Sequence, residues 1–335
     1  MAGAWASVRR DRDRWLLGSA ALVLAANFLE PGLQMEQPLF EHVVVLDVTQ
    51  SMNVTDQELA GRPVSRLAFA KHMLRHTLLK LPCGSKVGWG VFTEYRSFLL
   101  LAPVEVCAHL GELQSTLARI DGQMAWSGNS EVAKGLHSGI GIVKQLPQKP
   151  SLVFVTDGHE APPLNPRRRP PFDDKPGDAT GLIVGVGGLS PAPIPKTDPL
   201  GRPLGFWRAD DVLQSDPFSQ GRGGSVAGET MVVDKDAPVS PLPGTSPGSE
   251  HLSSLREGYL RQLAGELGLG YHRMQATEGP GVADALAAAM TPLDLARAVQ
   301  ARADLRPAFA VLALALLLAR HLQHWRTSLR ERLGT

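Results

Sequence analysis

The sequence predicts a doubly wound, mostly parallel α/β sheet that is flanked by N- and C-terminal transmembrane helices. Residues 42–48, 151–158 and 181–188 are apolar runs that end in polar or glycine residues, as buried parallel strands do. Segments with helical spacing of apolar residues alternate with these runs, which favours helices on both faces of one sheet. Uncharged stretches at 15–29 and 307–319 lie near the two ends of the chain.

The two uncharged stretches predict attachment to a membrane. Each is shorter than the roughly 20 residues that a spanning helix needs, so neighbouring residues must take part. Arginine favours the cytoplasmic side of a membrane, which places both termini in the cytoplasm and the main domain outside it. The first stretch could instead be a cleaved signal peptide, and the second a buried core helix. The arginines that flank the outer ends are Arg9, Arg10, Arg12, Arg14, Arg320, Arg326, Arg330 and Arg332.

The predicted domain boundaries follow from these assignments. Within the main domain, residues 189–250 form a long loop rich in Pro, Gly, Ser and Asp, and residues 237–250 have the composition of a disordered segment. The order along the chain is a cytoplasmic N-terminus (1–14), a transmembrane helix (15–35), the periplasmic domain (36–290), a linker (291–306), a second transmembrane helix (307–325) and a cytoplasmic tail (326–335).

The regular elements of the domain are expected in a fixed order. Strand 42–48 precedes a helix over 65–81, whose apolar residues share one face. The later elements are strands 86–93 and 97–104, helices 108–119 and 130–145, strands 151–158 and 181–188, a helix over 252–267, a strand at 270–274 and a helix over 280–290.

Composition argues against several classes of function. A formal net charge of +1 and an aromatic content of 6% argue against a nucleic-acid-binding surface. Two cysteines, Cys83 and Cys107, are too few for a four-cysteine zinc site or a disulfide-built scaffold. In an oxidising periplasm they are candidates for one disulfide that closes a loop of about 25 residues. Two separate buried thiols are the alternative.

Oxygen-bearing side chains cluster where the predicted strands end. Asp47, Thr49 and Ser51 follow the first strand, Asp157 follows the strand at 151–156, and Ser130 opens the helix between them. Ligands of open α/β sheets bind at the carboxyl ends of the strands, and hard oxygen ligands suit Mg²⁺, with Ca²⁺ or Mn²⁺ as alternatives. The two carboxylates balance one divalent cation. The alternative interpretation is that Asp47 and Ser51 only cap a helix.

Four further residues are candidates for the surroundings of the metal. Ser127 competes with Ser130 for the role of ligand. Asp56, His159 and Glu160 could form the outer shell. The alternative for His159 and Glu160 is a solvated loop, and for Asp56 a position on the approach to a helix.

This set of residues resembles the metal-ion-dependent adhesion site of von Willebrand factor A (vWA) domains, whose fold is Rossmann-like. Asp47, Thr49 and Ser51 match the family's Asp-x-Ser-x-Ser element, Ser130 matches a threonine at the start of a later helix, and Asp157 matches the last aspartate. Thr49 and Ser130 depart from the usual residue types but keep the hydroxyl. The resemblance covers most of the main domain.

Within that family the chain is similar to bacterial inner-membrane vWA proteins with an anchor at each end. Segments 81–84, 103–107 and 157–163 are similar to the MxaL-type branch. That resemblance implies a role in the maturation of a periplasmic quinoprotein methanol dehydrogenase, including its calcium supply. It also implies other membrane vWA proteins and a MoxR-type AAA+ ATPase as partners.

The function expected from these features is metal-dependent protein binding without catalysis, with an acidic residue of a protein partner on the metal. Two other classes remain open. One is a structural tether among membrane vWA proteins and a MoxR-type ATPase, with a vestigial metal site. The other is a metal-dependent hydrolase, against which the sequence offers no paired base and nucleophile beside a hydroxyl-rich site.

Overall fold

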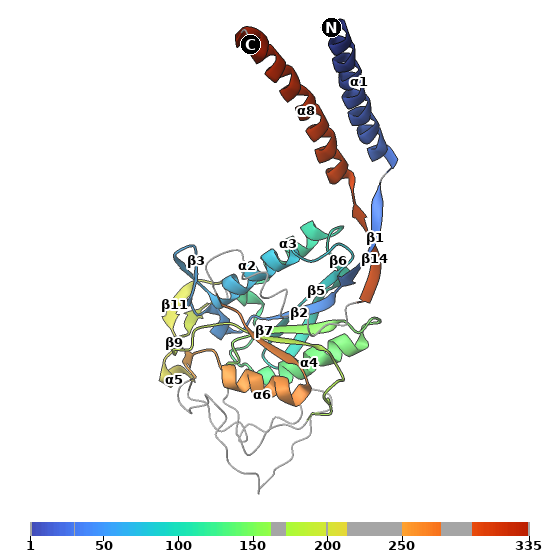
Figure 1. Ribbon diagram of the computed structural model, residues 1–335. Coiled ribbons are helices and arrows are strands. Elements are labelled where there is room, and N and C mark those ends of the chain that lie inside the picture. The colour runs from blue at the N-terminus through green and yellow to red at the C-terminus, as the bar shows by residue number, and fades with distance from the viewer. Residues whose placement is uncertain are drawn as a thin grey trace. The chain divides into compact units, whose positions relative to one another are not determined.

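The computed structural model describes residues 2–29, 31–161, 172–198, 200–212, 250–275 and 297–333. The chain divides into two compact units (Figure 1). The central unit comprises residues 38–297, and the terminal unit combines residues 1–37 with residues 298–335.

The central unit contains a sheet in which six of the described strands are joined. Strands β5 and β6 pair antiparallel, and the other neighbours pair parallel. This confirms the predicted mostly parallel α/β sheet. In spatial order the strands are β13 (Gly270–Arg273), β8 (Gly181–Gly185), β7 (Ser151–Thr156), β2 (Glu41–Asp47), β5 (Lys86–Thr93) and β6 (Arg96–Glu105).

The order of the strands creates a crevice at one place in the sheet. The chain first adds β5 and β6 on one side of β2, and then adds β7, β8 and β13 on the other side. Strands β2 and β7 are therefore neighbours whose following connections leave in opposite directions. In open α/β sheets ligands bind at the carboxyl ends of the strands at such a switch point.

Helices cover both faces of the sheet, as the alternation along the chain predicts (Figure 1). Helices α2 (Arg66–Leu78) and α3 (Leu110–Arg119) pack with Val44 and Leu46 of β2 on one face. Helices α4 (Val132–Gln145) and α6 (Glu257–Leu267) pack with Val43 and Val45 on the other. Because successive residues of a strand point to opposite faces, the continuous apolar run of β2 serves both cores.

Several short elements lie outside the predicted pattern. A hairpin of β3 (Gln57–Leu59) and β4 (Arg62–Val64) precedes α2. The segment 252–253, predicted as helix, pairs with β9, and α6 begins only at Glu257. Part of the predicted loop 189–250 is built of β9 (Ala192–Pro193), β10 (Pro195–Thr197), β11 (Pro203–Phe206) and helix α5 (Ala209–Val212), with β12 (Leu252–Ser253) directly after it.

Some predictions fall on residues outside the described part of the chain. They are the helix at 280–290 and residues 237–249 of the segment whose composition predicts disorder.

The terminal unit consists of two helices and a two-stranded ribbon. Helix α1 (Ala2–Ala26) continues through η1 (Asn27–Leu29), and strand β1 (Gly32–Leu39) pairs with β14 (Arg297–Asp304), which leads into α8 (Arg306–Leu333). The predicted first transmembrane helix (15–35) is therefore too long at its C-terminal end, where proline at position 31 cannot continue a helical hydrogen-bond ladder. Likewise, residues 297–304 of the predicted linker 291–306 form strand β14.

Helices α1 and α8 lie side by side within this unit (Figure 1). Ala20 and Ala313 are buried, at 2% and 1% exposure, so small residues lie where the helices meet. Large apolar side chains of both helices are exposed: Trp15, Leu17, Leu22 and Leu24 on α1, and Val311, Leu312, Leu314, Leu317, Leu318 and Leu322 on α8.

Within the described ranges, neither of these helices nor any other has both the length and the apolar character that crossing a membrane requires.

Candidate metal centre

The ends of β2 and β7 deliver the predicted ligands to the crevice. Asp47 is the last residue of β2, and Thr49 continues in extended conformation before the 3₁₀ turn η2 (Gln50–Asn53), which holds Ser51. Asp157 follows β7 directly. Gly158 then adopts a φ of +75°, so a residue without a side chain lets the chain turn away immediately after Asp157.

Ser130 reaches the same place by backbone pairing. Its N–H donates to the carbonyl of Ala161 at 2.7 Å, and the N–H of Ala161 donates back at 2.8 Å. On its other side, the N–H of Glu131 donates to the carbonyl of Glu94. Ser130 is thus fixed between the segment after β5 and the segment after β7, two residues before α4 begins.

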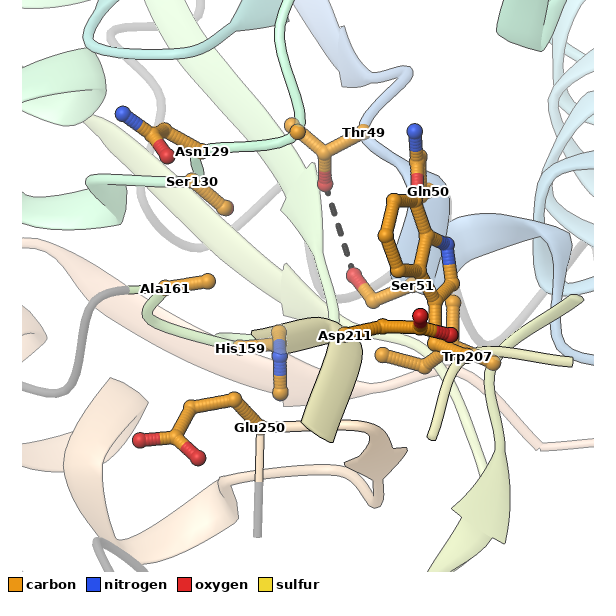
Figure 2. A pocket seen from close by; sticks show the side chains of 12 residues that line it. Thr49, Gln50, Ser51, Asn129, Ser130, His159, Ala161, Trp207, Asp211 and Glu250 are labelled. Carbon is orange, nitrogen blue, oxygen red and sulfur yellow. Dashed lines mark hydrogen bonds between the residues drawn. The ribbon is translucent and has the colours of Figure 1, made fainter. Parts of the chain in front are cut away.

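Three hydroxyl-bearing residues, Thr49, Ser51 and Ser130, line one cavity of about 160 Å³ (Figure 2). The hydroxyl oxygens of Thr49 and Ser51 lie 3.4 Å apart. The hydroxyl of Ser130 is buried and has no hydrogen-bond partner among the described residues. An orphaned buried hydroxyl is costly unless a ligand satisfies it. The cavity is further lined by Gln50, Gly128, Asn129, His159, Ala161, Ile194, Trp207, Asp211 and Glu250.

The two predicted carboxylate ligands, Asp47 and Asp157, are fully buried and are not among the residues that line the cavity. Asp47 Oδ1 accepts hydrogen bonds from the backbone N–H and the hydroxyl of Thr49, at 2.9 and 2.6 Å, and its Oδ2 accepts one from the hydroxyl of Thr156 at 2.6 Å. Asp157 Oδ1 accepts one bond, from the N–H of His159, and its Oδ2 accepts two, from Arg66 and Ser253. Since a carboxylate offers about four acceptor positions, each aspartate retains room for one further contact.

Asp157 is fully buried although it follows the end of a strand, where a position outside the apolar core is usual. The cause is Arg66, whose side chain is 0% exposed. Its guanidinium bonds Asp157 through Nη1 and Asp56 through Nε and Nη2, with an Nη2–Asp56 distance of 2.6 Å. Arg66 also donates to Ser253. The site is therefore a chain of alternating charges, Asp56, Arg66 and Asp157, beside Asp47.

Electrostatics favours a cation in this place. Burial is the main cause that raises the pKa of Asp47 to about 7, and the charge of Asp157 adds to it. Hydrogen bonds from Thr156 and Thr49 oppose the change, because they lower the pKa. A bound divalent cation would favour the charged carboxylate and release a proton. The donor set of neutral hydroxyls and acceptor carboxylates therefore fits a divalent metal ion, which would polarise any group that binds at its open position.

The four candidates for the outer shell lie in different environments. Asp56 holds Arg66 and accepts the N–H of Gly188. Burial opposes ionisation of Asp56, but the hydrogen bonds and charge of Arg66 outweigh it and lower its pKa. The hydroxyl of Ser127 accepts from the N–H of Asn129, and Ser127 does not line the cavity. His159 does line it.

Glu160 is directed away from the cavity. It is buried, and its Oε1 accepts the hydroxyl of Tyr259 at 2.7 Å and the N–H of Ala133, near the start of α4, at 3.1 Å. Burial raises the pKa of Glu160 to about 8. The structure thus connects Glu160 to the packing of α6 and α4, and places it in neither a solvated loop nor the cavity.

The pKa of Glu160 predicts a dependence of stability on pH. Between its ordinary value of 4.5 and about 8, the unfolded chain loses this proton while the folded chain keeps it, so stability falls as pH rises. Glu160→Gln keeps the acceptor oxygen and cannot ionise. From pH 6 to pH 8 we expect wild type to lose about 2 kcal/mol more unfolding free energy than the variant.

Urea unfolding at both pH values measures the difference, and Glu112→Gln, on the exposed surface of α3, is the control. Equal pH slopes for wild type and Glu160→Gln would contradict the assignment.

Several residues of the site carry no clear signal in the sequence. Arg66 opens an amphipathic helix, and nothing in its spacing distinguishes it from an exposed arginine. Trp207, Asp211 and Glu250 line the cavity from the region predicted as a loop, where periodicity gives no signal. Thr156 was visible only as part of the Thr-Asp-Gly sequence.

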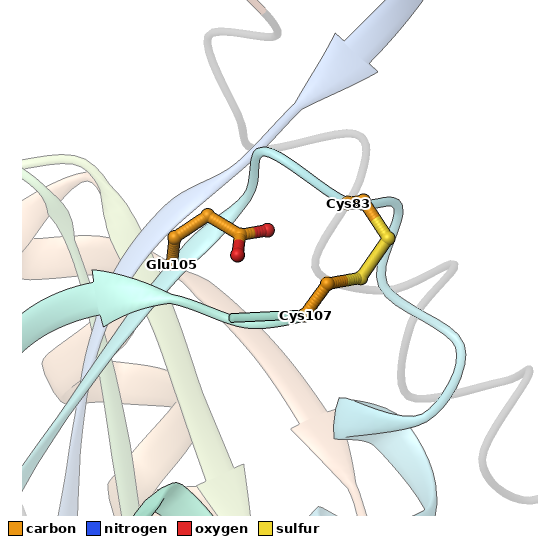
Figure 3. Close-up of side chains that lie close together, drawn as sticks. All are labelled: Cys83, Glu105 and Cys107. Atoms are coloured by element: carbon orange, nitrogen blue, oxygen red, sulfur yellow. A yellow bond between two sulfur atoms is a disulfide. The ribbon is translucent and has the colours of Figure 1, made fainter. Parts of the chain in front are cut away.

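A disulfide joins Cys83 and Cys107, with a Cα–Cα distance of 5.3 Å (Figure 3). It connects the turn before β5 to the segment after β6, so it lies at the edge of the sheet, away from the cavity. The carboxylate of Glu105 lies beside it and accepts the N–H groups of Gly84 and Ala108. Bonded sulfur atoms are not thiolate ligands, so these three residues form a structural link.

No protein-family profile matches the chain, and no curated protein matches it. Among solved structures, an aerotolerance-related membrane protein from Bacteroides fragilis is 17% identical, with 76% of this chain and 98% of that chain covered and a TM-score of 0.45. A membrane-spanning protein from Vibrio fischeri is 15% identical, with 71% and 93% covered and a TM-score of 0.27. A von Willebrand factor type A protein from Catenulispora acidiphila is 9% identical, with 46% and 34% covered and a TM-score of 0.28. Likenesses at these TM-scores carry no argument about function; the mostly parallel α/β sheet with its helices is consistent with a vWA-like fold.

Proposed function

We propose that this chain is a metal-dependent protein-binding module without catalytic activity. In this proposal one divalent cation binds to Asp47, Thr49, Ser51, Ser130 and Asp157, directly or through water. An acidic side chain of a protein partner then takes the open position of the metal. The module assists the assembly or metal loading of a periplasmic enzyme, of which quinoprotein methanol dehydrogenase is the example that the sequence resemblance suggests.

The observation that carries the proposal is the buried hydroxyl of Ser130, which faces the cavity beside Thr49 and Ser51 without a partner among the described residues. A hydroxyl group buried in this way gains most from a cation, because it can coordinate without adding charge. The position of the cavity at the switch point of the sheet supports the same proposal.

We further propose that the chain acts at the outer face of a bacterial inner membrane, with both termini cytoplasmic. One support is the exposed apolar surface of α1 and α8, which is unfavourable in contact with water. The other is the position of the arginines outside both apolar stretches. The Cys83–Cys107 disulfide agrees with an oxidising compartment. Other membrane vWA proteins and a MoxR-type ATPase remain the proposed neighbours.

The two rival functions have less support. A hydrolase would need an activated nucleophile, but neither ring nitrogen of His159 hydrogen-bonds a cavity hydroxyl within the described residues. A purely structural tether would not need the hydroxyl groups to face a common cavity. The tether is nevertheless a distinct outcome of the following experiment.

Ser130→Ala should lower the affinity for divalent metal on the order of tenfold, because it removes one oxygen ligand. The fold should be unaffected, since that hydroxyl makes no bond within the described chain. Calorimetric titration of the full-length protein with Mn²⁺ and Mg²⁺ gives the affinities. Ser127→Ala is the matched control, because Ser127 lies nearby and outside the cavity.

The same proteins, with and without EDTA, are then used to capture partners from solubilised membranes. Capture should fall with EDTA and with Ser130→Ala, and should persist with Ser127→Ala. If all samples capture the same partner equally, the tether replaces the metal-dependent module.

A further inference from the structure

His159 is a buried imidazole in the wall of the cavity. Its side chain lines the cavity together with Ser51 and Ser130 (Figure 2), and the residue is 4% exposed. Neither ring nitrogen makes a hydrogen bond of normal geometry within the described residues. Burying two polar atoms without partners costs free energy, so the position favours an occupant of the cavity that binds imidazole.

The surroundings of the His159 ring favour one of its two nitrogens as the atom that offers a lone pair to the occupant of the cavity. The backbone of Glu250 lies within weak hydrogen-bonding reach of the ring. Histidines that bind metals usually donate the N–H of the other nitrogen to a carbonyl or carboxylate. An interaction with the Glu250 backbone therefore leaves the remaining nitrogen with a free lone pair at the cavity.

We propose that His159 is a direct nitrogen ligand of the metal ion, which makes the site select borderline transition-metal cations such as Co²⁺ over Mg²⁺ and Ca²⁺. This inference rests on the proposed metal site and specifies its ion.

The reason is the preference of each cation for its ligands. Mg²⁺ and Ca²⁺ take oxygen donors almost exclusively, whereas imidazole suits later divalent metals. Three neutral hydroxyl groups bind a cation weakly, so a single nitrogen ligand has a large influence on which cation the site prefers. Asp211 and Glu250 also line the cavity, and their negative charge attracts every one of these cations. The resident ion would then differ from calcium, which the sequence resemblance associates with a client enzyme.

The test compares the affinities of the full-length protein for Co²⁺ and Mg²⁺ by competition titration. Wild type should bind Co²⁺ at least about tenfold more tightly than Mg²⁺. In His159→Leu and His159→Gln the affinity for Co²⁺ should fall on the order of tenfold, with less than about a threefold change for Mg²⁺. Leucine leaves no polar atom unsatisfied, and glutamine is a second variant in case the first fails to fold.

A spectroscopic measurement distinguishes direct ligation from contact through water. Wild type labelled with ¹⁵N-histidine and loaded with Mn²⁺ should show a nitrogen coupling in pulsed electron paramagnetic resonance, and His159→Gln should lose it. Ser130→Ala should weaken Co²⁺ and Mg²⁺ equally and keep the coupling.

Two failures are separable. If wild type binds no divalent metal, the proposed function fails and this inference fails with it. If metal binds but His159 variants keep the selectivity of wild type, or no coupling is seen, the metal site stands and direct ligation by His159 is wrong.

Discussion

Arg66→Met should destabilise the protein by about 3–5 kcal/mol in the absence of metal, because it removes one partner from a buried ion pair. Arg66 is 0% exposed and bonds both Asp157, which is also 0% exposed, and Asp56. Methionine fills a similar volume but, among the described residues, leaves Asp157 with Ser253 and one backbone N–H as its donors. The buried negative charge then lacks its counter-charge.

The measurement is the free energy of unfolding from denaturant titrations in EDTA. Arg261→Met is the matched control, because Arg261 pairs with Glu257 on the exposed surface of α6, at 61% exposure, where such pairs contribute less than about 1 kcal/mol. A loss for Arg66→Met no larger than that of the control would show that the buried pair does not hold the end of β7 in place.

Divalent metal should restore part of the stability of Arg66→Met. In wild type the guanidinium of Arg66 balances the negative charge of Asp157. A cation bound in the cavity would balance part of the same charge. The gain in unfolding free energy on adding Mn²⁺ should therefore be larger for Arg66→Met than for wild type. An equal gain would show that the cation does not act on Asp157.

Replacing Cys83 and Cys107 together by serine should reduce stability by about 3 kcal/mol, from the entropy that the closed loop removes from the unfolded chain. The two residues are separated by 24 positions, and the loop contains the whole β5–β6 pair. Reducing wild type with dithiothreitol should cause the same loss, and should not change the double variant. Metal affinity should stay the same, because the disulfide lies away from the cavity.

The state of the same cysteines in cells tests the proposed location. Protein denatured directly from cells without reductant should be unreactive to maleimide, because the periplasm oxidises exposed thiol pairs. Complete labelling of both cysteines would place the central unit in a reducing compartment and contradict the proposed orientation.

The sequence predicts the sheet well because β2, β7 and β8 are buried on both faces and therefore read as continuous apolar runs. The paired strand β6 alternates in burial, which also gives a recognisable pattern. The secondary structure was predicted wrongly where a strand forms by pairing with a segment that is distant in the sequence. Strand β14 carries charges and no regular pattern, and it is a strand because β1 lies beside it. Residues 252–253 pair with β9 instead of starting a helix, for the same reason.

The sequence predicts those residues of the candidate site that directly follow the end of a strand. Asp47 and Asp157 could be placed together because β2 and β7 are parallel neighbours. Arg66 could not, since its burial results from the way α2 packs over the ends of both strands, and no local pattern encodes that. The environments of His159 and Glu160, adjacent in sequence, differ because the extended chain points one side chain to the cavity and the next to α6.

The pairing of β1 with β14 has a consequence for assembly of the terminal unit. Residues between these strands form a loop of about 260 residues, and closing so long a flexible loop would cost roughly 5 kcal/mol. The paired strands hold the two segments together, so the helix that precedes β1 and the helix that follows β14 meet at a high effective concentration. The two terminal helices can then associate as a hairpin, even though their own interface consists of residues as small as Ala20 and Ala313. Pairing of β1 with β14 thus favours helix pairing, and a chain in which the two strands failed to pair would present two unpaired apolar helices.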